Sequence, residues 1–113
     1  MKKLLFLIAV SLVGGCVPES DFDSIAYEPK LVIDGAIESG GFPRVVLSKS
    51  ASYFMKIDSS NIRDLFMSTA RVTVSNGIDS EVLTLKRNDS SFPPYVYEGT
   101  TLKGETGMTY TLT

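Results

Sequence analysis

Hydrophobic and polar residues alternate in short runs from residue 30 onwards, and turn-forming residues separate the runs. The runs are rich in β-branched and aromatic residues, which fit a pleated and half-buried surface. The pattern predicts strands at residues 31–38, 44–48, 70–75, 81–86, 95–99 and 108–113. Short strands that follow one another about every ten residues are typical of an antiparallel β-sandwich, so we expect a mainly β fold.

Two pairs of neighbouring strands are predicted to form hairpins. Ser39-Gly40-Gly41 gives the backbone freedom for a turn after the first strand, and Pro43 precedes the second, where a missing N–H is tolerated. Asn76-Gly77 favours the positive φ angles of a tight turn between the strands at 70–75 and 81–86. We expect inward-facing side chains at Val72, Val74, Leu83, Leu85, Tyr95 and Tyr97, with the tyrosine hydroxyls in water.

The stretch between the second and third predicted strands breaks this pattern. Ile62, Leu65 and Phe66 recur at helical spacing, and Ser59-Ser60 can cap a helix, so we predict one short helical crossover. Tyr53-Phe54-Met55 precedes it. The sequence favours packing of this aromatic cluster at the edge of the core over a binding patch.

Residues 1–15 have the features of a secretory signal peptide. Lys2 and Lys3 form a basic start, and residues 4–13 form an apolar run that only Ser11 interrupts. This run is about half as long as the ~20 apolar residues that a membrane-spanning helix needs, and no second such run follows.

Cys16 is the strongest candidate site in the sequence. Val13, Gly14 and Gly15 stand directly before it and together resemble the bacterial lipobox. In proteins with that motif the thiol receives diacylglycerol, the signal is removed before the cysteine, and the new amine is acylated. We therefore predict Cys16 as a lipid anchor to a membrane, since two or three long acyl chains hold a protein firmly. The alternative is cleavage elsewhere, which leaves Cys16 as a free or buried thiol.

Residues 16–29 are predicted to be the anchor and a flexible acidic tether. Glu19, Asp21 and Asp23 provide negative charge without any nearby base. Such acids after a lipidated cysteine resemble export signals of surface lipoproteins in Bacteroidetes-type bacteria. The sequence therefore leaves two alternatives, a protein on the cell surface and a protein on the periplasmic side of the outer membrane. Ser24, between Asp23 and Ile25, fits a pattern on which such bacteria attach O-glycans.

Composition narrows the possible chemistry. The sequence has no His and one Cys, which excludes Ser-His-Asp triads, Cys/His nucleophiles and His or multi-Cys metal sites within this chain. It has 11 Lys and Arg against 13 Asp and Glu, and removal of the signal makes the balance more acidic, so we expect no nucleic-acid partner. No nucleotide-binding loop, nucleophile elbow or EF-hand is present. We expect neither an enzyme nor a cofactor or metal site.

The order of motifs resembles a Bacteroidetes lipoprotein family of unknown function. The matching segments are 27–35, 43–48, 70–77 and 104–112, which follow the anchor in the family's order. The resemblance implies an immunoglobulin-like or prealbumin-like sandwich and an outer-membrane location. The family is often encoded beside TonB-dependent outer-membrane receptors, which implies such a receptor as partner in nutrient uptake or receptor assembly. The resemblance implies no catalytic residue in this chain.

Members of that family are longer, and this chain resembles their N-terminal part. The last predicted strand, 108–113, has no turn after it, so we expect the β-sandwich domain at 30–113 to be truncated. Two functions follow from the sequence. The first is a lipid-anchored, non-catalytic accessory or binding module, and the alternative is the N-terminal non-catalytic module of an envelope hydrolase whose catalytic part is absent.

Overall fold

The computed structural model of the protein describes residues 26–53 and 55–113. It contains seven short strands and one turn of 3-10 helix. These elements are β1 (Leu31–Ala36), β2 (Arg44–Lys49), η1 (Ile62–Leu65), β3 (Thr73–Ser75), β4 (Ser80–Val82), β5 (Thr84–Arg87), β6 (Tyr95–Glu98) and β7 (Thr111–Leu112).

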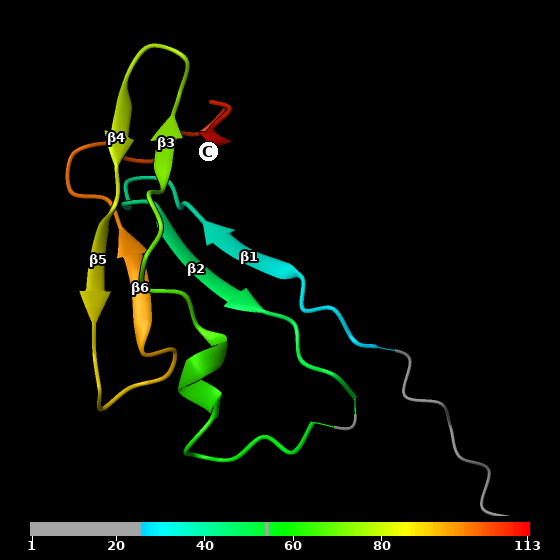
Figure 1. The fold of residues 1–113 in the computed structure, drawn as a ribbon. Helices are drawn as coiled ribbons and strands as arrows, with labels where there is room; N and C mark the ends of the chain where they lie inside the picture. The colour runs from blue at the N-terminus through cyan, green and yellow to red at the C-terminus, as the bar shows by residue number, and fades with distance from the viewer. Residues whose placement is uncertain (1–25, 54) are drawn as a thin grey trace, which may run out of the picture.

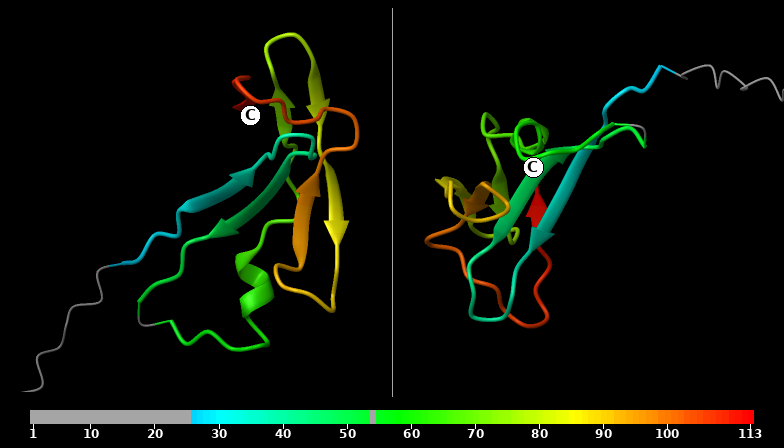
Figure 2. Two further views of the ribbon diagram at one scale, coloured as in Figure 1. Left: turned by 180° about the vertical axis from the view of Figure 1, so that it is seen from behind. Right: turned by 90° about the horizontal axis from the view of Figure 1, so that it is seen from below.

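The strands form two antiparallel sheets, as Figures 1 and 2 show. The larger sheet has the order β1-β2-β6-β5 and the smaller has the order β4-β3-β7. The mainly β, sandwich-like architecture predicted from the sequence is therefore confirmed. The immunoglobulin-like or prealbumin-like type stays a prediction.

The first predicted hairpin is present. β1 pairs with β2 from Leu31 opposite Lys49 to Ala36 opposite Arg44, and Gly40 in the turn has a φ of 79°. β1 is shorter than the predicted strand at 31–38, because the chain beyond Ala36 turns toward another partner. Ser39 forms a parallel bridge with Gly104, and the N–H of Gly40 donates to the Gly104 carbonyl at 2.7 Å.

The predicted strand at 81–86 is two strands that belong to different sheets. β4 pairs with β3 in the small sheet, while β5 continues the same direction and pairs with β6 in the large sheet (Figure 1). The chain crosses at Leu83, whose side chain is buried in the core and whose N–H donates to the Val72 carbonyl at 2.8 Å. The predicted hairpin at Asn76-Gly77 is therefore correct for β3 and β4 only.

The predicted helix is a single 3-10 turn, and neither serine caps it. Its N-cap is Asn61, which makes no side-chain capping bond. The preceding turn is held instead by Asp58, whose Oδ1 accepts the N–H of Ser60 at 2.9 Å and that of Asn61 at 3.2 Å. A carboxylate is a stronger acceptor than a serine hydroxyl, and short Asp side chains readily close such turns.

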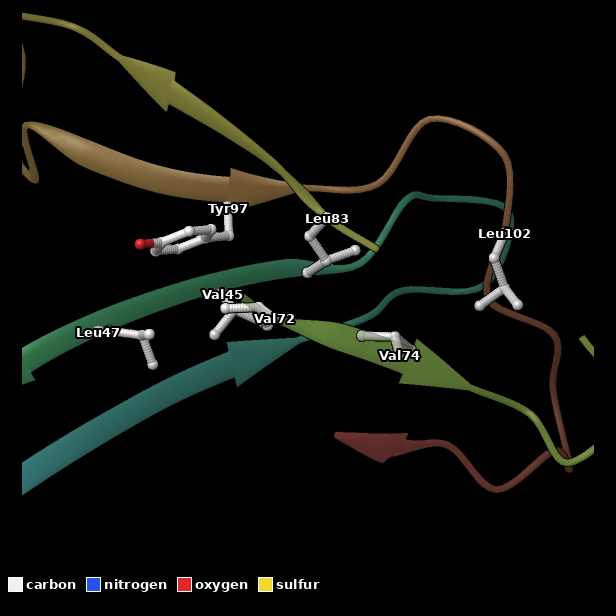
Figure 3. Close-up of a cluster of buried hydrophobic side chains, with 7 residues drawn as sticks. All are labelled: Val45, Leu47, Val72, Val74, Leu83, Tyr97 and Leu102. Atoms are coloured by element: carbon white, nitrogen blue, oxygen red, sulfur yellow. The ribbon is translucent and has the colours of Figure 1, made fainter. Parts of the chain in front are cut away.

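A small hydrophobic core lies between the sheets (Figure 3). Its buried members are Val45, Leu47, Val72, Val74, Leu83, Tyr97 and Leu102. Tyr97 faces inward as predicted but its hydroxyl is not in water: it accepts the N–H of Ala70 at 3.0 Å and donates to the Met67 carbonyl at 3.2 Å. Buried phenols need partners, and here the backbone before β3 supplies them.

β7 is shorter than the predicted strand at 108–113. Its two residues pair with β3, Leu112 opposite Val74 and Thr111 opposite Ser75. The residues before it fold back locally, because the Tyr110 hydroxyl accepts the N–H of Glu105 at 2.8 Å and donates to the Lys103 carbonyl at 3.0 Å.

Candidate functional site

The sequence-predicted modification sites lie outside the described residues. These are the lipobox residues Val13, Gly14 and Gly15, the lipidation site Cys16 and the O-glycosylation site Ser24. Lipidation and glycosylation therefore stay predictions. In the described part of the chain no helix has the length and apolar character needed to cross a bilayer.

β1 is the most exposed apolar segment of the sheet region. It forms one edge of the large sheet, and each of its residues is exposed. Leu31 is 55% exposed and Ile33 53%, although both belong to a strand that pairs along its full length with β2. Aliphatic side chains left in water to this extent on one strand are unusual and suggest contact with another molecule.

The register shows which way these side chains point. Ile33 lies opposite Leu47 and Gly35 opposite Val45, and directly opposed residues share one face of an antiparallel sheet. Because Leu47 and Val45 belong to the buried core, Leu31 and Ile33 also lie on the core-facing side of the sheet. The small sheet does not reach far enough to cover them.

An apolar pocket continues this uncovered strip between the two sheets. It has a volume of about 160 Å³, and its lining comes from β1, β2, β3 and β7 and includes Gly35, Ile37, Tyr110 and Leu112. Figure 2 shows β7 lying against the β1–β2 hairpin at this place. We call the combined surface the open flank and define it by Leu31, Ile33, Ile37, Tyr110 and Leu112.

Charged side chains elsewhere form contacts that hold loops in place. The Asp89 carboxylate accepts from Arg63 of η1 at 2.7 Å and from Arg87 of β5 at 3.1 Å. Hydrogen bonds from Arg87 and then from Arg63 hold the pKa of Asp89 below its ordinary value. Phe66 and Phe92 pack edge to face beside it with ring centroids 5.1 Å apart. This cluster ties η1 to the β5–β6 loop.

Glu81 has a similar structural role at the other end of the fold. Its carboxylate accepts the backbone N–H groups of Thr100, Thr101 and Leu102 and thereby fixes the loop after β6. Among residues 26–53 and 55–113 no three or more acidic or cysteine side chains gather in a way that could hold a metal ion. The open flank is therefore the candidate site, and its chemistry is apolar binding.

No protein-family model matches the chain, and no curated protein or solved structure does so either. The resemblance to the lipoprotein family, the outer-membrane location and the receptor partner stay predictions.

Sequence reasoning missed the open flank, although a signal was present. Leu31-Val32-Ile33 is a continuous apolar run, unlike the alternating strand around Val72, and a continuous run on an edge strand leaves apolar side chains on both faces. The aromatic cluster that we expected to pack at the core edge does not do so at Tyr53, which is 94% exposed; Phe54 lies outside the described residues.

Proposed function

We propose that the protein is a lipid-anchored, non-catalytic accessory module of the bacterial outer membrane, which binds a protein partner through the open flank. The observation that carries the binding role is the exposure of Leu31 and Ile33 on the core-facing side of the sheet, next to an apolar pocket. The buried centre of a protein–protein interface has this apolar character.

The predicted anchor places the open flank near the membrane. Cys16 stands after a short apolar run and small residues, as in bacterial lipoproteins, and only residues 17–30 separate it from β1. The open flank begins on that first strand, so it lies on the part of the domain that is closest to the membrane along the chain. The proposed partner is a TonB-dependent receptor, because the family resemblance implies one and because such a receptor lies in the same membrane.

The anchor is tested by Cys16→Ser in cells that are fed labelled palmitate. We expect the wild type to take up label and to fractionate with membranes, and the variant to lose both properties. Ser24→Ala is the matched control: it lies in the same tether and should keep the lipid. Continued labelling of Cys16→Ser in the membrane fraction would contradict the proposal.

The partner is tested by crosslinking in intact membranes followed by purification of the tagged lipoprotein. We expect a TonB-dependent receptor to co-purify with the wild type and to be strongly reduced with Ile33→Asp, which places a charge on the open flank. Ile78→Asp is the control, because Ile78 is the same residue type and is even more exposed, at 84%, but lies in the β3–β4 turn outside the open flank. Absence of any such receptor from the wild-type sample would refute the receptor as partner.

A further inference from the structure

β1 offers a second kind of binding surface, namely its backbone edge. The Lys30 carbonyl accepts the N–H of Ser50 at 2.8 Å, so the backbone groups of Lys30 face the hairpin partner. Backbone groups alternate in direction along an antiparallel strand. The N–H and C=O groups of Leu31, Ile33 and Gly35 therefore point away from β2, and no strand of the described part of the chain pairs with them.

This edge carries few of the features that usually prevent strand addition. Natural edge strands are protected by proline, by lysine within the strand, by bulges or by a covering loop. β1 has neither proline nor lysine between Leu31 and Ala36, and it pairs without a bulge along its whole length. The only charged residue within β1 is Asp34, and Lys30 directly precedes the first residue of the strand. Both are exposed, and the ion pairs of the described residues lie elsewhere, at Asp89.

We propose that β1 pairs antiparallel with β1 of a second copy of this chain, with Val32 on the two-fold axis. In this register Leu31 lies opposite Ile33 of the second copy, and the outward N–H and C=O groups of both residues exchange hydrogen bonds. Lys30 lies opposite Asp34 of the second copy, and the symmetry repeats this pair on the other side of the axis. Opposite charges directly across two strands stabilise their pairing.

Neighbouring registers that keep the outward backbone groups opposed do not make this charge pair. An axis at Leu31 puts Asp34 opposite Glu28 of the second copy, which is a repulsive pair. An axis at Ile33 puts Asp34 opposite Val32 and Lys30 opposite Ala36. The charges of β1 thus select the register centred on Val32.

The dimer is compatible with a membrane anchor on each copy. Residues 17–29 separate Cys16 from Lys30, and an extended chain of that length spans about 45 Å. Both anchors can therefore reach one bilayer although the paired strands run in opposite directions. The two large sheets become one continuous sheet, and the core-facing side chains of Leu31 and Ile33 form cross-strand pairs at its centre. The dimer does not depend on the receptor partner.

Val32→Cys in the otherwise native lipoprotein tests the proposal directly. Residues at the centre of a non-hydrogen-bonded antiparallel pair have Cα atoms about 4.5 Å apart, within the range that a disulfide can bridge. Mild oxidation of membranes should therefore convert most of this variant to a covalent dimer. Asp34→Cys is the matched control. The side chain at position 34 points to the same face as that of Val32, but in the dimer the two copies of residue 34 lie about 13 Å apart along the strands, so this variant should stay monomeric. The wild type, whose single cysteine is Cys16, shows whether oxidation of Cys16 itself produces any covalent dimer.

A charge exchange tests the register. Adding Asp34→Lys to Val32→Cys should lower the yield of crosslinked dimer several-fold, and adding Lys30→Asp as well should restore it. Within one chain these two residues are about 13 Å apart, so restoration can only arise between copies. Light scattering of the wild type in detergent should give the mass of a dimer. A monomeric wild type, a more efficient crosslink from Ile33→Cys than from Val32→Cys, or crosslinks only to other proteins would each overturn the proposal.

Discussion

Replacement of Glu81 by glutamine should destabilise the fold, although the side chain keeps its size. Oε1 of Glu81 accepts the N–H of Thr100 at 2.6 Å, and Oε2 accepts that of Leu102 at 2.8 Å. The Thr101 N–H lies 3.1 Å from both oxygens. A glutamine amide nitrogen in place of one oxygen would face an N–H donor. Because the carboxylate is partly solvated, we expect a loss of about 1.5 kcal/mol, at the low end for hydrogen bonds to a charged group.

The effect should depend on pH. Partial burial alone raises the pKa of Glu81, but the N–H groups of Leu102, Thr100 and Thr101 and the Thr100 hydroxyl together lower it by more, so the pKa lies below its ordinary value of 4.5. A lowered pKa in the folded state means that the carboxylate stabilises the fold above about pH 4.5, and that this contribution is lost as the pH falls through the folded value. The difference between wild type and Glu81→Gln should therefore shrink below that pH.

Thermal and guanidinium unfolding of the full chain in detergent measure the effect. The chain has five tyrosines and no tryptophan, so tyrosine fluorescence and far-ultraviolet circular dichroism are suitable signals. For a domain of this size, a loss of about 1.5 kcal/mol lowers the melting temperature by about 6–12 °C. Glu105→Gln is the control, because it makes the same charge change at an exposed loop position. Equal melting of Glu81→Gln and Glu105→Gln at pH 7 would refute the reasoning.

Two further substitutions probe close contacts in the fold by the same unfolding measurements. Gly104→Ala should cost about 1–3 kcal/mol, since its Cβ would lie 2.2 Å from the Glu38 carbonyl oxygen, whereas Gly41→Ala meets only ordinary contacts and should cost much less. Tyr97→Phe should cost about 1–3 kcal/mol, because two backbone groups lose their hydroxyl partner; Tyr95→Phe on the same strand should be nearly neutral, and equal losses would contradict this account.

Local patterns predicted those strands whose partners are also local. Val72 and Val74 alternate with polar residues, and the turn that follows favours a return strand, so β3 and β4 could be found from the sequence. The break at Leu83 could not, because the only local sign is that two adjacent apolar residues, Val82 and Leu83, interrupt the alternation, and this does not show that the strand divides between two sheets. Only contacts with distant segments, Val72 on one side and β6 on the other, decide that the chain changes sheets there.

The candidate site was harder to predict than the fold. A run such as Leu31-Val32-Ile33 normally indicates burial, and nothing in its neighbourhood shows how far the opposite sheet extends. That extent depends on β7, which is two residues long and pairs with Val74 and Ser75 of β3. The predicted lipid anchor is the reverse case, because the sequence motif that predicts it is local, but Cys16 lies outside the residues that the structure describes.

The two binding roles proposed for β1 use different directions in space and can therefore coexist. Strand pairing takes place within the plane of the sheet, through the outward backbone groups of Leu31 and Ile33. Docking of the proposed partner on the open flank would take place perpendicular to that plane, through the side chains of the same residues. A dimer would place the two copies of these side chains next to each other and so double the apolar strip. Since binding free energy increases with the apolar area removed from water, a partner that covers both copies should bind more tightly than one that covers a single copy.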